Sequence, residues 1–225
     1  MKVAIHQPEF MPWLGYFHKM READIYVILD NVQFKKRYFE NRNYIRNNNT
    51  KEWITIPVIT KGKYNQNISN VEISYNENWC KKISTTFINR YGVNKVTDSF
   101  NDLLFNYTAL QNTSLLNLNL SIIDWFRDNF NITTPIVYQS DFNINSNGSD
   151  LILDICKNIK ATTYICGPSG KDYLNIDNFK AEDITIEWQE FNEPDYNNLG
   201  LSHLSSYDFV QHFGLHCSDK FNKLI

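Results

Sequence analysis

The apolar positions along the chain fall into short continuous runs that alternate with helical patterns. Residues 3–5 are continuously apolar and are soon followed by Pro8, which cannot donate a ladder hydrogen bond. Apolar side chains then recur at helical spacing over residues 12–23, and residues 25–29 form a second continuous apolar run. A strand, a helix and a strand in such a short stretch predict a parallel βαβ unit with a right-handed crossover.

The rest of the chain continues this alternation and adds a helical middle. Residues 53–58 predict a strand, and Pro57 within it indicates an edge position. Residues 31–50 show no such pattern and predict a long irregular loop of the kind that covers a substrate. The remaining predicted elements are helices over residues 77–91, 97–111, 114–129, 150–160 and 205–213 and strands over residues 135–138, 162–166 and 184–191.

These elements together predict an α/β fold. We expect a mostly parallel sheet with a helical insertion or cap at about residues 77–130. The 225 residues are 42% hydrophobic, which supplies a core and argues against intrinsic disorder. That length lies within the reach of one α/β domain, so we expect a single domain over residues 1–225.

Charge, cysteine content and hydropathy exclude several classes of protein. Lys plus Arg number 22 and Asp plus Glu number 25, so the net charge of −3 provides no positive field for a nucleic-acid backbone. The four scattered cysteines fit reduced thiols, and the sequence shows neither a signal-like apolar start nor an apolar run of membrane-spanning length. We therefore expect a cytoplasmic protein without a membrane span or a nucleic-acid partner, and a homodimer is left open.

Metal and cofactor sites find little support in the sequence. His212 and His216 are four residues apart, which is a ligand spacing on a helix, but Gly214 between them is expected to end that helix. Cys166 follows a predicted strand and is more typical of a small core residue than of a catalytic thiolate. We predict no metal ligands and no cofactor.

Polar segments follow three of the predicted strands. Residues 6–9 follow the first strand, residues 30–33 follow the second, and residues 167–170 follow a late one. Ligands of open parallel sheets bind at the carboxyl ends of the strands, where loops and helix N-termini meet. We therefore expect these three segments to line one pocket.

His6 is the candidate proton acceptor of that pocket. An imidazole at a strand end that faces a helix N-terminus would stay neutral and able to accept a proton. The alternative is a histidine that only caps the loop backbone, and the sequence does not separate the two. Glu9 or Asp30 could supply a carboxylate partner, although Asp30 could instead form an Asx turn.

A cluster of cations follows the second strand. Its members are Lys35, Lys36, Arg37, Arg42 and Arg46. Arginine forks bind phosphate oxygens in a bidentate manner and asparagines add donors, so the cluster suits a phosphate clamp. The alternative is a solvated charged loop. Arg42 stands between Asn41 and Asn43, and we expect it to be the principal phosphate ligand.

The segment Gly167-Pro168-Ser169-Gly170 is rich enough in glycine for backbone amides to approach an anion. It matches neither the GxSxG pattern of a nucleophile elbow nor a Walker loop. The segment therefore does not indicate a serine nucleophile.

The chain resembles the WbqC-like family of bacterial proteins, which are encoded among genes for surface polysaccharide assembly. The resemblance begins in Ile5-His6-Gln7-Pro8 and is most specific in Pro12-Trp13-Leu14-Gly15-Tyr16-Phe17. It continues over residues 19–24, 29–34, 41–43, 164–173 and 204–214. Cys166 departs from the small residue expected before Gly167, which further weakens a thiol mechanism.

The resemblance implies synthesis of O-antigen or related glycan sugars, with acyl or aminoacyl transfer, for example of a glycyl group, to an amino sugar. We therefore expect a transferase that binds a nucleotide-linked amino sugar and an unidentified acyl or aminoacyl donor. The alternatives are a non-catalytic nucleotide-sugar-binding or assembly partner, and an ATP-dependent enzyme similar to nucleotidyltransferases. The latter rests on a weaker likeness of the βαβ start to the HUP class of Rossmann-like folds, whose HxGH histidines are missing around Gly15.

The candidate residues are assigned as follows. The predicted catalytic residues are His6, Glu9 and Asp30. The predicted substrate-binding residues are Gln7, Trp13, Tyr16, Lys19, Gln33, Arg37, Asn41, Arg42, Gly167, Ser169, Gly170 and Tyr173. Within this set His6 would take the amine proton, while Lys19, Arg37 and Arg42 would hold phosphates.

Overall fold

The computed structural model describes residues 1–225, and its contacts divide the chain into two units. Unit 1 consists of residues 1–7, 15–31 and 132–192. Unit 2 consists of residues 8–14, 32–131 and 193–225. Interleaved segments of this kind do not by themselves separate one domain from two, so the single domain stays a prediction.

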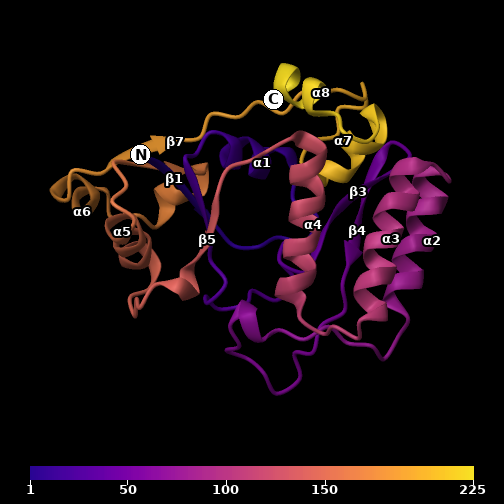
Figure 1. The fold of residues 1–225 in the computed structure, drawn as a ribbon, viewed down its shortest axis with the longest axis horizontal. Coiled ribbons are helices and arrows are strands. Elements are labelled where there is room, and N and C mark those ends of the chain that lie inside the picture. The colour runs from indigo at the N-terminus through magenta and orange to yellow at the C-terminus, as the bar shows by residue number, and fades with distance from the viewer. The chain divides into compact units, whose positions relative to one another are not determined.

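Unit 1 is built on a five-stranded sheet in which all strands are parallel. Its strands are β1 (Lys2–His6), β2 (Ile25–Ile28), β5 (Ile136–Tyr138), β6 (Thr163–Cys166) and β7 (Thr185–Trp188). Their order is β5-β2-β1-β6-β7, so β2 and β5 lie on one side of β1 and β6 and β7 lie on the other (Figure 1). This is the order of a doubly wound Rossmann-like sheet, and the predicted α/β class is confirmed.

Helices connect the parallel strands of unit 1 because parallel neighbours require a crossover. They are α1 (Leu14–Arg21), α5 (Gly148–Asn158) and α6 (Ile176–Ala181), with short 3-10 turns at Gln139–Asp141 and Pro168–Asp172. The apolar side chains of β1 and β2 are buried, as expected of central strands in a parallel sheet.

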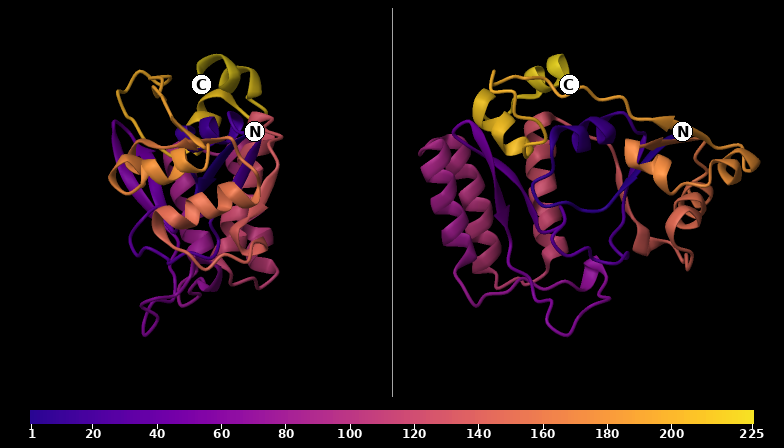
Figure 2. Two further views of the ribbon diagram at one scale, coloured as in Figure 1. Left: turned by 90° about the vertical axis from the view of Figure 1, so that its left-hand side faces the viewer. Right: turned by 180° about the vertical axis from the view of Figure 1, so that it is seen from behind.

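Unit 2 contains the helical middle of the chain and a separate hairpin. Its helices are α2 (Trp79–Tyr91), α3 (Lys95–Ala109), α4 (Leu115–Phe130), α7 (Ser206–Phe213) and α8 (Ser218–Leu224), with a 3-10 turn at Ile68–Asn70. Figure 1 shows α2 and α3 side by side, and Figure 2 shows from behind that α7 and α8 lie near α4. The predicted helical insertion is confirmed, whereas α6 and α8 were not predicted. No helix in the structure combines the length and the apolar character that crossing a membrane requires.

Aromatic rings from separate helices form the core of unit 2. Phe87 of α2, Phe100 of α3 and Tyr207 of α7 lie with ring centroids 4.5–5.4 Å apart. Asn94 caps α3 by accepting hydrogen bonds from two backbone N–H groups, and Gly214 ends α7 with a φ of 88°, as predicted. The helices thus begin and end where local residue chemistry indicates, while ring packing sets their arrangement.

The prediction of an irregular loop over residues 31–50 is wrong for its second half. Residues Arg42–Asn47 form strand β3, which pairs antiparallel with β4 (Thr50–Thr55) in a two-stranded sheet of its own. The predicted strand at 53–58 is therefore shifted and lies outside the parallel sheet. The pattern was missed because charged and amide side chains hide the alternation, in which Asn43 and Ile45 are buried between half-buried neighbours.

Candidate functional site

Three of the predicted site segments leave the sheet of unit 1 at one edge. β1 is parallel to both β2 and β6, so the chain after His6, after Ile28 and after Cys166 emerges at the same carboxyl-terminal edge. The strand order reverses between β1 and β6, which makes their loops the topological switch point of the sheet. The structure thus brings the His6 loop and the Gly167 loop to the part of such a sheet where ligands bind.

The His6 imidazole is neutral at this edge. Nδ1 lies 3.1 Å from the Gln7 carbonyl oxygen, which can only accept, so Nδ1 carries the proton and Nε2 is the basic nitrogen. Burial, and then the nearby Lys19 ammonium, lower the pKa of His6 to about 3. The Tyr16 ring meets the imidazole edge to face at 5.1 Å and fixes its orientation.

Lys19 lies beneath the sheet edge rather than on the surface. Its side chain is buried, and Nζ donates a long hydrogen bond of 3.4 Å to the Ile5 carbonyl oxygen. After burial, which is the larger cause, this ammonium lowers the pKa of His6 further. That Lys19 also holds a phosphate stays a prediction.

Asp30 lies just after the neighbouring strand, β2, and fixes its end by hydrogen bonds. Its carboxylate accepts hydrogen bonds from the backbone N–H and the hydroxyl of Ser140, at 3.0 and 2.6 Å. This joins the end of β2 to the turn after β5, and a catalytic role of Asp30 stays a prediction. The contact depends on residues 110 positions apart, which no local pattern reveals.

The loop after β6 forms the tight turn Pro168–Asp172, in which the two glycines differ. A Cβ on Gly170 would lie 2.1 Å from the Cys166 sulfur, so this glycine is required by packing. A Cβ on Gly167 would meet nothing within 4 Å, which leaves that position open to a ligand. Ser169 and Tyr173 are exposed. Burial raises the pKa of the Cys166 thiol, as suits a core cysteine.

Two predicted site residues of unit 2, Asn41 and Trp13, and the neighbouring Asn43 make contacts within that unit. Asn43 donates to the carbonyl oxygens of Phe10 and Met11, and Asn41 donates to that of Ile56. The Trp13 ring stacks on His203 with centroids 4.9 Å apart. Glu9 is buried, so its carboxylate does not lie on the open surface.

The five cations of the basic cluster have different environments. The Arg42 guanidinium stacks on Trp53, and the Lys35 ammonium lies over Tyr38, each 3.9 Å from the ring centroid. Lys36 and Arg37 form no ion pair within 4 Å and line a cavity. Arg37 has a φ of 61°, unusual for a residue other than glycine. Arg46 alone is bound in an ion pair.

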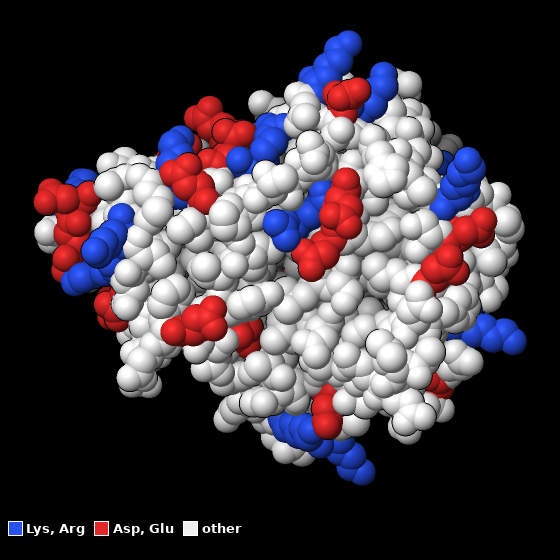
Figure 3. Space-filling model, viewed as in Figure 1, with Lys and Arg blue, Asp and Glu red and all other residues white.

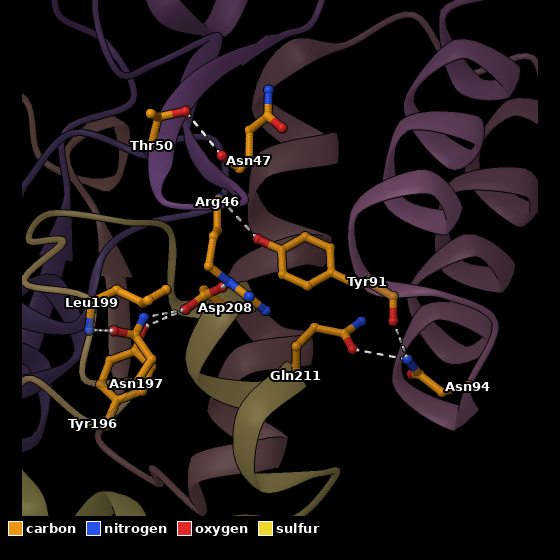
Figure 4. A network of polar contacts seen from close by, with 10 residues as sticks. All are labelled: Arg46, Asn47, Thr50, Tyr91, Asn94, Tyr196, Asn197, Leu199, Asp208 and Gln211. Carbon is orange, nitrogen blue, oxygen red and sulfur yellow. Dashed lines mark hydrogen bonds and ion pairs between the residues drawn. The ribbon is translucent and has the colours of Figure 1, made fainter.

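Arg46 belongs to the buried network drawn in Figure 4, and its sequence-based assignment to a phosphate clamp is wrong. Its Nε lies 2.8 Å from a carboxylate oxygen of Asp208, which is 2% exposed. Tyr196 and Asn197 donate to the other oxygen at 3.0 and 3.1 Å. Arg46 therefore compensates a buried carboxylate and joins β3 to α7.

Two adjoining cavities lie beside the remaining cations. The larger, about 470 Å³, is lined by Gln33, Phe34, Lys35, Lys36, Thr60, Lys63 and Tyr64. The smaller, about 340 Å³, includes Lys36, Arg37, Asn41, Arg42 and Thr55 and shares Phe34, Lys36 and Thr60 with the larger. Five cationic side chains and no carboxylate line the two, which we call the cationic cleft.

The cationic cleft is a local feature of the surface. In Figure 3 the charged side chains stand in small scattered groups on a largely uncharged face, and several of these groups contain both signs. A short anionic group such as a diphosphate suits such a site better than a long polyanion does.

Glu40 anchors the loop that carries three of the cations, and the sequence reasoning missed it. Its buried carboxylate accepts hydrogen bonds from the backbone N–H groups of Lys35 and of Glu40 itself, while Oε2 has no hydrogen-bond partner. Burial outweighs these bonds and raises the pKa of Glu40 to about 7. A single acidic residue at the end of a cationic run was the available signal. Thr60, Lys63 and Tyr64 were also missed, and the short Gly62 loop was their only signal.

The motif residues at the sheet edge and around the hairpin can be compared with known sequences. The sequence model of the WbqC-like protein family matches residues 7–214, which is nearly the whole chain. The chain belongs to the WbqC-like protein family. This WbqC-like protein is 29% identical over 200 residues to the uncharacterized protein Rv1507c of Mycobacterium tuberculosis. The aligned residues cover 88% of this chain and 86% of the relative. No solved structure matches the chain.

Membership of the WbqC-like family confirms the predicted resemblance. The matched range contains every predicted site residue except His6, which lies one position before it. No group of three or more His, Cys, Asp or Glu side chains in this WbqC-like protein could hold a metal ion.

Proposed function

We propose that this WbqC-like protein transfers an acyl or aminoacyl group to the amine of a nucleotide-linked amino sugar used for bacterial surface polysaccharide. The cationic cleft carries the proposal. Five cationic side chains line it. Lys63 is paired with Glu72 at 2.8 Å, and the other four suit the two negative charges of a sugar-linked diphosphate. Arg42 adds a planar fork, held by stacking on Trp53, that can bind two phosphate oxygens.

The transfer step is assigned to His6. The sugar amine nitrogen attacks the acyl carbon of a thioester or of a mixed acyl–phosphate anhydride, so a C–N bond forms and the bond to the leaving group breaks. Nε2 of His6 accepts the proton that the amine loses, and the leaving group departs with the bonding electrons and is then protonated. An imidazole whose pKa is lowered to about 3 is unprotonated throughout the neutral range but is a weak base, so the proposal requires that the negative charge of the bound substrate raise the pKa of His6 before it takes the proton.

The test is a product analysis with defined partners. UDP- and GDP-linked amino sugars are incubated with acyl-coenzyme A thioesters and with aminoacyl adenylates, and the sugar product is weighed by mass spectrometry. We expect the mass of one acyl or aminoacyl group to be added to the amine in the presence of the wild-type protein. Binding of the nucleotide sugars without product from any donor would contradict transfer and favour a non-catalytic nucleotide-sugar-binding partner.

A further inference from the structure

The two cavities of the cationic cleft differ in what they offer a ligand. The smaller one has the arginine fork of Arg42 and the guanidinium of Arg37, which suit phosphate oxygens. The larger one has an exposed ring, Tyr64, over a floor that includes the buried Phe34, with the Gln33 amide at its side. Lys36 lines both cavities and marks the place where they meet.

Tyr64 is exposed, while its carbonyl oxygen accepts a hydrogen bond of 3.5 Å from Gln33 and the residues that follow it are held by backbone hydrogen bonds. Its side chain is 87% exposed. The segment around it is tied to the strand-like residues before the basic cluster, because Phe34 donates to the Gln66 carbonyl oxygen and Ile68 donates to that of Val32, both at 2.9 Å. A ring on a held backbone offers a stacking surface at a low cost in conformational entropy.

From this arrangement we infer that the larger cavity is a nucleobase subsite, in which the base of a nucleoside diphosphate stacks on Tyr64. This inference rests on the proposed function and names the part of the ligand that each cavity takes. The diphosphate lies in the smaller cavity against Arg37 and Arg42, and Lys36 contacts it at the junction. Stacking on an aromatic ring tolerates any base. The Gln33 amide nitrogen donates to the Tyr64 carbonyl oxygen and to Asn65 Oδ1 at 3.5 and 3.4 Å, and its oxygen can accept from a base edge.

The nucleoside diphosphate can come from two sources in an acyl transfer. It is part of a nucleotide sugar, and it is also part of a coenzyme A donor. UDP and GDP represent the first source, coenzyme A represents the second, and inorganic pyrophosphate represents the phosphates without a base. The four probes are compared by isothermal titration calorimetry on the full chain.

Tyr64→Ala, Tyr64→Phe and Lys61→Ala are the variants for this comparison. Tyr64→Ala should weaken binding of the nucleotide that uses the cleft about tenfold and leave pyrophosphate binding unchanged, because only the stacking is lost. Tyr64→Phe keeps the ring and should bind like the wild type. Lys61 lies in the same loop but lines neither cavity, so Lys61→Ala controls for loss of a loop charge.

The outcomes separate this inference from the proposed function. UDP, GDP or coenzyme A binding that Tyr64→Ala leaves unchanged, or that falls together with pyrophosphate binding, would overturn the subsite. Tyr64-dependent binding of UDP or GDP without acyl transfer would retain the subsite and overturn the transferase. Tyr64-dependent binding of coenzyme A alone would retain the subsite and assign the cleft to the donor. Failure of all four probes to bind would overturn both.

Discussion

The sheet edge of unit 1 and the cationic cleft of unit 2 use their polar residues in opposite ways. At the sheet edge several candidates already make structural contacts: Asp30 binds Ser140, Lys19 binds the Ile5 carbonyl, and Nδ1 of His6 lies against the Gln7 carbonyl. In the cleft Lys36 and Arg37 line cavities without an ion pair. A sequence motif rich in polar residues can therefore serve the structure as well as a binding site. The cations of the cleft lie outside that motif and line the cavities.

The strongest test of this difference between the two regions is to remove the imidazole of His6. His6→Ala should lower the transfer rate by roughly two to four orders of magnitude and leave nucleotide binding intact, because only the proton acceptor is lost. Single-turnover kinetics and calorimetry measure the two effects. His18→Ala, which removes a half-buried histidine of α1, is the matched control. A His6→Ala protein that melts far below the wild type yet keeps its specific activity would show a structural cap.

The protonation state of His6 sharpens the same contrast. The folded pKa of about 3 lies below the ordinary value, so the imidazole stays neutral from pH 8 down to pH 5. Its contribution to stability is complete above about pH 6.5 and is lost as the pH falls toward 3. The NMR shift of the His6 ring proton, assigned by its absence in His6→Ala, should stay flat over pH 5–8. A titration near pH 6.5 would contradict the buried environment.

The next largest effect is expected at Glu40, whose buried carboxylate holds the loop that carries Lys35 of the cationic cleft. Its pKa is about 7 in the folded protein and near 4.5 when unfolded, so the folded state holds the proton between these values. Stability should fall as the pH rises through this window, by about 3 kcal/mol at most. Glu40→Gln cannot ionise and should become more stable than the wild type as the pH rises from 5 to 8.5, as measured by urea unfolding.

The exposed Glu77 provides the control for that experiment. Glu77→Gln removes a carboxylate in the turn before α2, which lies 3.8 Å from Lys82 Nζ on the surface. The difference in stability between this variant and the wild type should change little with pH. A constant difference between Glu40→Gln and wild type over the whole pH range would show that Glu40 does not titrate near neutrality.

The two glycines of the loop after β6 test the scaffold of the sheet edge. Gly170→Ala places a Cβ against the Cys166 sulfur and should destabilise the protein by about 1–3 kcal/mol through overpacking. Gly167→Ala meets nothing and should be nearly neutral for stability. Adding Cys166→Ala to Gly170→Ala should recover part of the loss. Equal melting temperatures for the two single variants would mean that the loop is looser than its packing indicates.

The smallest effect is expected for a change that keeps charge and alters shape in the cleft. Arg42→Lys retains the cation but loses the fork and the stacking on Trp53, so nucleotide-sugar binding should weaken by about 1–2 kcal/mol. Arg42→Ala should weaken it further, and Lys61→Ala should not. Unchanged affinity in both Arg42 variants, at low and at moderate salt, would mean that the loop is only solvated and that phosphates bind elsewhere.

Much of the fold could be predicted because local patterns report burial along a single element. The apolar runs at 3–5 and 25–29 became central strands, and the periodic segments of the helical middle became α2, α3 and α4. The hairpin β3–β4 escaped because its outward face carries Arg42, Tyr44 and Arg46 rather than simple polar residues. Its turn is an asparagine in the left-handed region, Asn48 with a φ of 53°, a residue type whose abundance in this chain masks such signals.

The sequence by itself determined the strands and helices with clear apolar periodicity, the class of sheet and where cations cluster, because each depends on neighbours within a few positions. Only the tertiary structure decided which of those cations are available. Arg46 is neutralised by Asp208, 162 positions away, and the pKa of Glu40 and that of His6 depend on burial by residues from distant segments. Electrostatic partners and desolvation are properties of the packed chain, so the chemistry of the site appears only after folding.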